Sequence, residues 1–200
     1  MAAERLDTET RQGQIKKAVL DIISTEGIGK LSTRNLATKI GVTEGALFRH
    51  FSSKKEIMLS ILNDVKSELL AEQERITYSS TLSAEEKLYK FLCKHIKYLI
   101  ENKGVTILLF SEAAHMNEQQ LKKGLREILL TQKEYISRII KQGINEGIWD
   151  KNINIENFAT LYMGIPISLN IEMILEPGVP KQEKFCERMI SLIKRALEKK

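Results

Sequence analysis

Apolar residues recur at every third or fourth position along most of this chain, a spacing that places them on one face of an α-helix. We find no persuasive alternation of apolar and polar residues of the kind that favours a β-strand. The pattern predicts about nine helices, over approximately residues 10–26, 33–40, 44–50, 54–75, 84–101, 105–115, 118–146, 155–175 and 181–199. We therefore expect an all-α protein.

The segment from Leu31 to Lys55 has the pattern of a helix-turn-helix. Its first helix follows Ser32 and its second follows Thr43, both good N-cap residues. Gly41 stands at the sharp turn between the helices, where only glycine takes a left-handed backbone without steric cost. Ala37 is small enough to let the second helix cross close to the first. In this motif the second helix enters the major groove of DNA.

The distribution of charge supports DNA binding by this segment. Six cations and one anion lie between Lys30 and Lys55, so the segment accounts for the whole formal net charge of +5. Cations around a reading helix neutralise phosphates, which supply most of the non-specific affinity for DNA. A solvated basic face on an ordinary helix pair is the alternative interpretation of the charge alone. Together with the helix-turn-helix pattern, the charge favours DNA binding.

Composition argues against several other classes of protein. Hydrophobic residues make up 42% and charged residues 28% of the 200 residues, as in soluble globular proteins. The polar N-terminus lacks the apolar core of a secretory signal, and no apolar run approaches the roughly 20 residues of a membrane span. Cys93 and Cys186 have no metal-ligand spacing around them, so we expect reduced, buried thiols in a cytoplasmic protein. We expect no metal, no cofactor and no membrane partner.

Catalytic and metal-binding motifs are weak. Glu112 and His115 have a spacing close to that of a metal-ligand pair, but a single Glu-x-x-His favours a polar pocket or a surface position. Ser111 does not lie in a Gly-x-Ser-x-Gly elbow, and no phosphate-binding glycine loop occurs. The sequence therefore does not indicate an enzyme.

The clearest break in the helical pattern lies at residues 77–83, but we place the functional boundary earlier, within the fourth predicted helix. Residues 1–58 are expected to form the DNA-binding domain, and residues 59–200 a ligand-binding and dimerisation domain. A ligand cavity between the central helices is one interpretation of their aromatic and polar residues, and ordinary core packing is the other. The candidate ligand contacts are His95, Tyr98, Phe110, Glu112, Met116, Tyr135, Tyr162 and Asn170.

The segment from Phe158 to Leu175 is apolar nearly all round, which a surface helix of a monomer does not tolerate. Gly164 and Ser168 would permit a close approach of a second helix, and Pro166 predicts a kink. We therefore expect the last two helices of each subunit to form a four-helix contact on the two-fold axis of a homodimer. A central helix buried within one subunit is the alternative.

The N-terminal part resembles the tetracycline-repressor-like (TetR/AcrR) family of bacterial transcription regulators over about Ile15 to Met58. The motifs that carry the resemblance are Ser32-Thr33-Arg34, Leu36-Ala37, Gly41-Val42-Thr43, Gly45, Leu47-Phe48, His50-Phe51, and Lys54 with Ile57. Over the remaining residues the match is architectural only. The resemblance implies an all-helical homodimer in which a small molecule in the C-terminal domain changes the spacing of two DNA-reading heads.

The same resemblance implies which residues touch DNA. Hydroxyls at helix N-termini and a lysine at the start of the fourth helix would hold phosphates, because exposed backbone N–H groups favour an anion there. Arg34 corresponds to a position that reaches a base edge in some members, and guanine would be its natural partner. The implied phosphate or backbone contacts are Ser32, Thr33, Thr43, His50 and Lys54; Glu44, Gly45 and Ala46 face bases; Phe48 and Arg49 lie beside them.

Two residues depart from the family pattern. Phe48 stands where the family usually has tyrosine, so a hydroxyl contact to phosphate is absent. Glu44 is acidic at a position that faces DNA, where it would either accept a hydrogen bond from cytosine or turn outward to weaken non-specific binding. Both departures affect the operator preference rather than the fold.

These observations favour a ligand-responsive transcription repressor that binds a palindromic double-stranded DNA operator and is released by a small-molecule effector. A ligand-independent architectural DNA-binding protein is one rival, and a small-molecule carrier or enzyme is another. The C-terminal domain is far larger than dimerisation needs, which disfavours the first. The lack of a catalytic constellation disfavours an enzyme.

Overall fold

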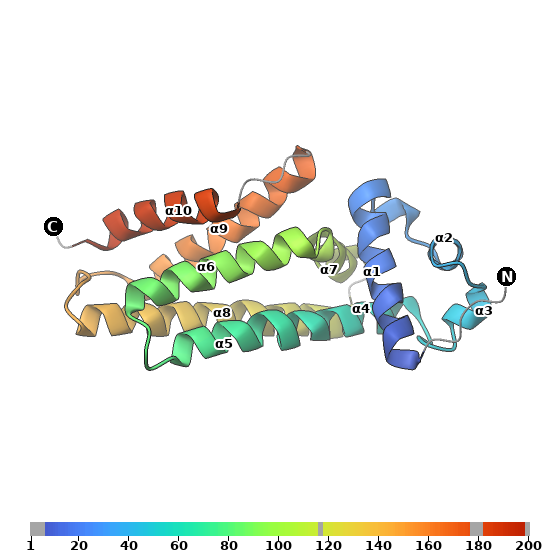
Figure 1. Ribbon diagram of the computed structural model, residues 1–200, viewed down its shortest axis with the longest axis horizontal. Helices are drawn as coiled ribbons and strands as arrows, with labels where there is room; N and C mark the ends of the chain where they lie inside the picture. Colours follow the sequence, from blue (N-terminus) through green and yellow to red (C-terminus); the bar gives the residue numbers. More distant parts are fainter. Residues whose placement is uncertain (1–6, 116–117, 177–181, 199–200) are drawn as a thin grey trace. The chain divides into compact units, whose positions relative to one another are not determined.

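The computed structural model describes residues 7–115, 118–176 and 182–198. Helices account for most of these residues, and no β-strand occurs among them (Figure 1). The chain forms two compact units. Unit 1 contains the described residues up to Val65 together with Asn102–Leu125, and unit 2 contains Lys66–Glu101 together with the described residues from Arg126 onward. The all-α prediction is confirmed.

Unit 1 is built from short helices around one apolar core. Its helices are α1 (Thr8–Glu26), a 3₁₀ turn (Ile28–Lys30), α2 (Thr33–Lys39), α3 (Glu44–Leu47), α4 (Lys54–Asp64), α7 (Val105–His115) and the start of α8 (Gln119–Asn145). Ile15, Val19 and Ile22 form the buried stripe of α1, which contacts α2, α4 and α7. Burial of each such side chain contributes about 1.5–3 kcal/mol. Packing therefore stabilises α2 and α3, which are too short to persist alone.

Gly104 allows α7 to begin close to α1. Its φ is +86°, a left-handed conformation that side chains disfavour. A Cβ at this position would also lie 3.2 Å from the Cγ2 atom of Ile23 and 3.2 Å from the carbonyl oxygen of Leu20. Glycine is therefore required here by both the backbone conformation and the close approach.

Unit 2 is a bundle of longer helices. It contains α5 (Ala71–Tyr78), α6 (Ala84–Glu101), the greater part of α8, α9 (Ile155–Leu175) and α10 (Gln182–Leu197). α6 contacts α5, α9 and α10 (Figure 1). The fully buried ring of Phe91 packs edge-on against Tyr135 of α8 and Tyr162 of α9, with centroid distances of 6.5 and 6.2 Å. Such edge contacts add to the apolar burial that holds the bundle together.

α8 ends where the chain folds back over a glycine. Gly147 has a φ of +76°, and the N–H groups of Ile148 and Trp149 donate to the carbonyl oxygen of Gly143 at 3.1 and 3.3 Å. The indole ring of Trp149 is 2% exposed and lies directly on the backbone of Gly143. A Cβ on Gly143 would stand within 2.6 Å of ring carbons, so no side chain fits between the helix and the indole.

A π-helical segment, Val65–Leu70, joins α4 to α5. The buried residues along this run keep an unbroken four-residue spacing, namely Ile57, Ile61, Val65, Leu69 and Gln73. A helix with 3.6 residues per turn would carry such a series steadily around its axis, whereas the wider π turn takes up the excess. The sequence prediction contained an ordinary helix here and missed the π turn.

The boundaries of the other helices agree closely with the periodicity of the sequence. α6, α7 and α9 begin and end at the predicted residues, and the remaining ends lie within three residues of the prediction. The boundary expected after residue 58 stays a prediction about function. The compact units themselves change over at Val65, Glu101 and Leu125.

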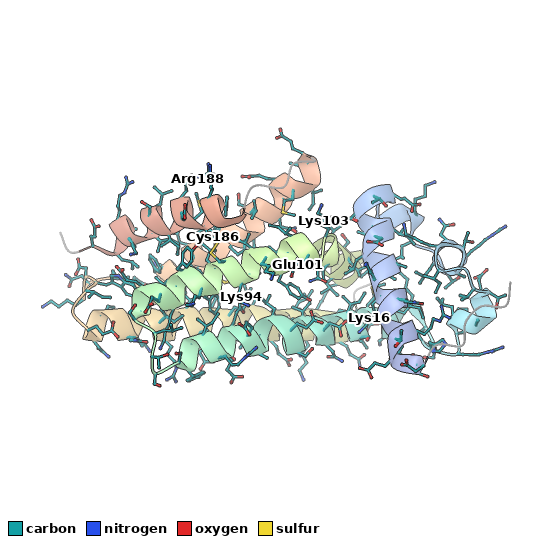
Figure 2. All side chains as sticks on the ribbon, viewed as in Figure 1. Lys16, Lys94, Glu101, Lys103, Cys186 and Arg188 are labelled. Carbon is teal, nitrogen blue, oxygen red and sulfur yellow. A yellow bond between two sulfur atoms is a disulfide. The ribbon has the colours of Figure 1, made fainter. Side chains whose placement is uncertain are left out.

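The cysteines correct one expectation from the sequence. Cys93 of α6 and Cys186 of α10 are joined by a disulfide, and Cys186 lies in the region between the two helices (Figure 2). The prediction of two reduced thiols is therefore wrong. The cysteines are 93 residues apart in sequence, and only the packing of α10 on α6 brings their Cα atoms to 5.7 Å, a normal separation for a disulfide.

The apolar helix α9 corrects a second expectation. By length and composition alone it could cross a membrane, although the sequence analysis found no such segment. Within unit 2, Phe158, Tyr162 and Leu169 of α9 are buried in the core. Of the most apolar 18-residue stretch of this helix, 39% is buried. One side of α9 therefore belongs to the core of the bundle.

Candidate nucleic-acid interface and buried polar cluster

Gly41 turns the chain between α2 and α3 with a φ of +69°, the left-handed conformation predicted for it. The N–H of Gly41 donates to the carbonyl oxygen of Thr38 at 3.2 Å, and that of Val42 donates to Ala37 at 2.9 Å. These bonds satisfy carbonyls at the end of α2. Ala37 is 3% exposed, and α2 and α3 contact each other. Unit 1 thus contains a helix-turn-helix.

Hydroxyl side chains cap the helices of this head. The Oγ atom of Ser32 accepts the N–H of Asn35 at 3.1 Å, and the Oγ1 atom of Thr43 accepts that of Ala46 at 3.2 Å. Each hydroxyl still has its own hydrogen to donate, since only a lone pair is used in the cap. The geometry therefore leaves both side chains able to bind a phosphate oxygen beside the N-terminus of a helix.

Glu44 has a partner that the sequence did not indicate. Its Oε2 atom accepts a hydrogen bond from the hydroxyl of Thr33 at 2.6 Å, which links the N-terminal residues of α2 and α3. The sequence left open whether this carboxylate faces cytosine or turns outward. In the structure the Glu44 carboxylate instead binds Thr33, and both residues were predicted to touch DNA.

Half of the cations counted between Lys30 and Lys55 are paired with carboxylates of unit 1. The ammonium of Lys39 lies 3.5 Å from Glu26, that of Lys54 lies 2.7 Å from Glu112, and that of Lys55 lies 3.0 Å from Glu118. The three cations without an ion pair among the described residues are all exposed: Lys30, Arg34 and Arg49. The two arginines therefore provide the least compensated charge of the helix-turn-helix.

The remaining predicted DNA contacts differ in accessibility. Phe48 is 45% exposed, Gly45 is exposed, and Ala46 is half-buried. His50 is tied to the body of unit 1, because its carbonyl oxygen accepts the Nε2–H of Gln12 at 2.9 Å. The Nδ1 atom of His50 is buried and has no hydrogen-bond partner among the described residues.

Unit 2 contains a cluster of buried polar side chains. Gln132 of α8 donates from Nε2 to the Oε1 atom of Gln73 on α5 at 3.0 Å, and the same nitrogen lies 3.5 Å from Nδ1 of His95 on α6. Gln73 is fully buried and Gln132 is 3% exposed. The Nε2 atom of Gln73 has no hydrogen-bond partner in the described part of the chain. An unpaired buried amide costs about 1–3 kcal/mol, so it calls for an acceptor.

His95 is the titratable member of this cluster. Desolvation by the surrounding bundle lowers the pKa of its imidazole to about 4. Yet the residue keeps part of its accessible surface, since its burial is only intermediate. A partly accessible imidazole with a strongly shifted pKa is a candidate functional group.

The residues predicted to bind a ligand are divided between the units. His95, Tyr98, Tyr135, Tyr162 and Asn170 belong to unit 2, Phe110 and Glu112 belong to α7 of unit 1, and Met116 lies outside the described residues. The Tyr162 hydroxyl donates to the carbonyl oxygen of Leu88 at 2.6 Å, so it is a satisfied core residue.

The surroundings of Phe110 and Glu112 differ from those of residues that line an enclosed ligand cavity. Phe110 is 56% exposed, and Glu112 is occupied by the ammonium of Lys54. Gln73 and Gln132 were missed by the sequence analysis. The signal was present, because each glutamine occupies an apolar position of its helix stripe, Gln73 after Leu69 and Gln132 after Ile128.

Together with the fold, the helix-turn-helix of unit 1 indicates a class of protein. A capped helix-turn-helix with exposed arginines, followed by an all-helical bundle, is typical of DNA-binding regulators of transcription. Residues 15–61 match the family described as bacterial regulatory proteins, tetR family, and residues 64–173 match the C-terminal region of YsiA-like proteins. The chain belongs to the TetR family.

The relatives that this chain resembles have names that indicate different roles. The nucleoid occlusion factor SlmA of Aliivibrio fischeri (strain MJ11) is 27% identical over 121 residues, which cover 59% of this chain and 60% of that protein. The fatty acid metabolism regulator protein of Bacillus subtilis (strain 168) is 24% identical over 134 residues, 67% of this chain and 68% of that protein. The match with SlmA thus spans about three fifths of that relative's length.

The fold is also that of solved structures. The ketosteroid transcriptional regulator KstR2 of Mycobacterium tuberculosis aligns with a TM-score of 0.76 over 100% of this chain and 99% of that chain. The two sequences are only 16% identical. This likeness concerns the fold alone.

Proposed function

We propose that this protein is a ligand-responsive repressor that binds a palindromic operator as a homodimer and is released by a small-molecule effector. The observation that carries the proposal is the capped helix-turn-helix of unit 1 with its exposed arginines. It acts in the cytoplasm and has no catalytic role.

In the DNA contact, Arg34 and Arg49 supply the charge and the hydroxyls of Ser32 and Thr43 bind phosphates. The Thr33–Glu44 hydrogen bond, 2.6 Å long, sets the spacing of the starts of α2 and α3. This assignment of Glu44 as a positioning residue replaces direct cytosine contact. Removal of a phosphate contact weakens binding to all sequences, whereas removal of a base contact relaxes the sequence preference.

The effector site is centred on the cluster of Gln73, His95 and Gln132. The unpaired Nε2–H₂ of Gln73 would donate to an acceptor on the effector, and the apolar bundle around it would hold a hydrocarbon body. An acyl compound has both parts. The name of the Bacillus subtilis relative, a fatty acid metabolism regulator, agrees with this choice.

The dimer contact uses α9 and α10. Large apolar side chains of α9 are exposed in the single chain, and Gly164 and Ser168 are exposed between them. These residues follow the three- and four-residue spacing of one helix face: Leu161, Gly164, Ile167, Ser168, Ile171, Ile174 and Leu175. With exposed Leu192 of α10 they form an apolar face that a second copy would cover.

Release from DNA requires that the effector bind the DNA-incompetent state more tightly than the competent one. Within unit 1, the route to the head runs through the start of α4. Lys54, the predicted phosphate contact, is held at 2.7 Å by Glu112 of α7, which is 8% exposed. A shift of α7 against α4 would change the position of this ammonium, and with it the phosphate contact.

Fluorescence anisotropy with labelled DNA from upstream of the gene, at two salt concentrations, tests the DNA contact. We expect sequence-selective binding that weakens at least tenfold in Arg34→Ala, while Lys103→Ala, an exposed lysine outside the helix-turn-helix, binds as the wild type does. Equal binding to scrambled DNA, or an unchanged affinity of Arg34→Ala, would refute the DNA assignment.

The effector assignment is tested on the same complex with dodecanoic and octadecanoic acids and their thioesters. We expect at least one of them to release the DNA from the wild type, and Gln73→Leu to stay bound. Release of Gln73→Leu at the wild-type concentration would contradict the site.

The likeness to SlmA over 121 residues favours one second candidate, a DNA-binding factor that works without a small molecule. In that case the bundle would be a protein-interaction scaffold. Sequence-selective binding that none of the acyl compounds changes, together with a wild-type melting temperature that they do not raise, would favour this candidate.

A further inference from the structure

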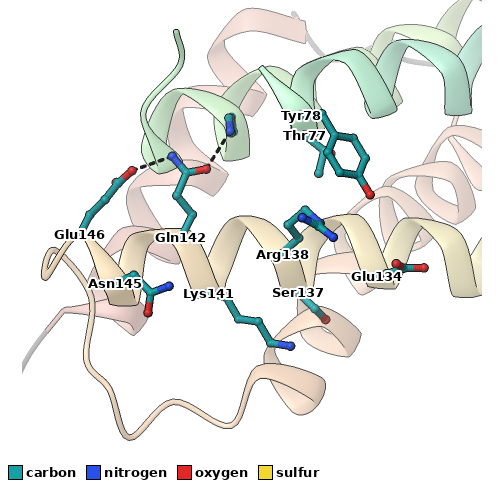
Figure 3. A pocket seen from close by; sticks show the side chains of 10 residues that line it. Thr77, Tyr78, Glu134, Ser137, Arg138, Lys141, Gln142, Asn145 and Glu146 are labelled. Carbon is teal, nitrogen blue, oxygen red and sulfur yellow. Dashed lines mark hydrogen bonds between the residues drawn. The ribbon is translucent and has the colours of Figure 1, made fainter. Parts of the chain in front are cut away.

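A pocket of about 700 Å³ opens in unit 2, apart from the glutamine–histidine cluster, where the end of α5, the first turns of α6 and the second half of α8 meet (Figure 3). Its volume is that of sites which hold metabolites. The side chains that line it are mostly polar or charged: Thr77, Tyr78, Lys87, Glu134, Ser137, Arg138, Lys141, Gln142, Asn145 and Glu146.

Lys87 is the unusual member of this wall. It is only 4% exposed, and its ammonium donates one hydrogen bond, to the Oε1 atom of Gln142 at 2.7 Å. Gln142 in turn donates from Nε2 to Glu146 at 2.6 Å (Figure 3). The hydrogen-bond partner of this buried cation is thus a neutral amide. The carboxylate of Glu146 contacts that amide and makes no ion pair with Lys87. Burial lowers the pKa of Lys87, and only the charge of Glu146 opposes this.

Two more cations of α8 line the pocket. The guanidinium carbon of Arg138 lies 4.7 Å from the centre of the Tyr78 ring, and Lys141 follows one turn later (Figure 3). Neither has a carboxylate within ion-pair distance among the described residues. The ring holds the guanidinium by its face, which leaves the N–H groups at the edge free to donate in the plane.

We propose that this pocket binds a phosphate-bearing small molecule, with the phosphate held by Lys87, Arg138 and Lys141. A buried ammonium with unused donors is stabilised by an anion, and planar arginine donors match phosphate oxygens two at a time. Glu134 and Glu146 at the margins reduce the formal charge of the wall to +1, so the preference for phosphate rests on the paired donors of Arg138 and on the buried ammonium of Lys87 rather than on net charge. The open volume beside Tyr78 accommodates the uncharged part of the ligand.

Isothermal titration of the full chain with inorganic pyrophosphate at low ionic strength tests the proposal. Lys87→Met keeps the apolar stem and removes the charge, and Arg138→Gln changes an exposed side chain that the fold does not need. We expect each variant to bind pyrophosphate at least tenfold more weakly than the wild type. Lys151→Gln, an exposed lysine of the same unit away from the pocket, is the matched control and should bind as the wild type does.

Citrate at equal ionic strength is the comparison anion, and we expect it to bind at least tenfold more weakly than pyrophosphate. The proposal is overturned if the wild type does not bind pyrophosphate at millimolar concentration. It is equally overturned if Lys87→Met and Arg138→Gln both bind pyrophosphate as tightly as the control Lys151→Gln. It is also overturned if citrate binds as tightly as pyrophosphate, since the site would then bind anions without selectivity for phosphate. Far-ultraviolet circular dichroism establishes that each variant is folded, and Arg138→Gln decides the outcome if Lys87→Met is not.

Discussion

Replacement of Gly143 by alanine should destabilise unit 2 substantially. A Cβ would meet three carbons of the Trp149 indole, the most distant of them at 2.6 Å, whereas real Cβ contacts essentially never fall below 3.0 Å. The obstacle is a rigid ring that is 2% exposed, so it cannot swing into solvent without losing its own burial. Overpacking of this kind costs about 1–3 kcal/mol, and the clash here belongs at the upper end.

Alanine also gains from helix propensity, because it is about 1 kcal/mol better than glycine inside a helix. The net cost is then about 2 kcal/mol, which corresponds to a fall in melting temperature of roughly 4–8 °C for a chain of this size. The measurement is thermal unfolding followed by circular dichroism. Gly13→Ala is the matched control, since nothing lies within 4 Å of its Cβ position in α1 and the melting temperature should rise slightly.

Double substitution gives the sharper test. Trp149→Leu removes the ring and has its own cost, but Gly143→Ala should then add little to it, because the clash has gone. We expect a coupling energy of about 1–3 kcal/mol between the two sites. Strictly additive costs, or a Gly143→Ala protein as stable as the wild type, would show that the indole does not occupy the place described.

Three further predictions concern charge, pH and assembly. Glu112→Gln should release Lys54 for phosphate binding, so that the slope of log K against log salt steepens by about 0.9 per subunit in DNA titrations; an unchanged slope would mean that Lys54 makes no additional phosphate contact. His95 binds a proton in the unfolded chain below about pH 6.5 but in the folded chain only near pH 4. The free energy of unfolding should therefore fall by up to about 3 kcal/mol as the pH drops through this window. Chemical unfolding at a series of pH values measures this dependence, and His95→Leu should flatten it. Ile171→Glu should convert the dimer to a monomer in sedimentation equilibrium, whereas a persistent dimer would place the contact elsewhere.

The helices and the head were predictable from the sequence because local rules decide them. Gly41 takes the left-handed turn, Ser32 and Thr43 cap their helices, and the apolar periodicity marks the ends of α6 and α9. These features depend on neighbours within a few residues. The sequence therefore contains them in readable form.

What the sequence did not reveal depends on residues far apart along the chain. The pairing of Lys54 with Glu112 spans 58 residues, and that of Cys93 with Cys186 spans 93. Charge counting treated Lys54 as free, although a carboxylate from α7 neutralises it. Tertiary packing alone decides which distant side chains meet, so the candidate effector site was found only in part: His95 was expected and Gln73 was not.

The π turn at Val65–Leu70 has a consequence for how this helix would tolerate a deletion. The five buried positions at four-residue intervals, from Ile57 to Gln73, span 16 residues (73 − 57), whereas four turns of a regular α-helix take about 14.4 residues. We infer that the π turn accommodates an extra residue within the helix. A relative that lacks one residue here should have an unbroken helix with the same buried side chains. Deletion of one residue within the π turn should accordingly be tolerated, whereas deletion of a single residue within α5 would move the buried face of every residue that follows it in that helix.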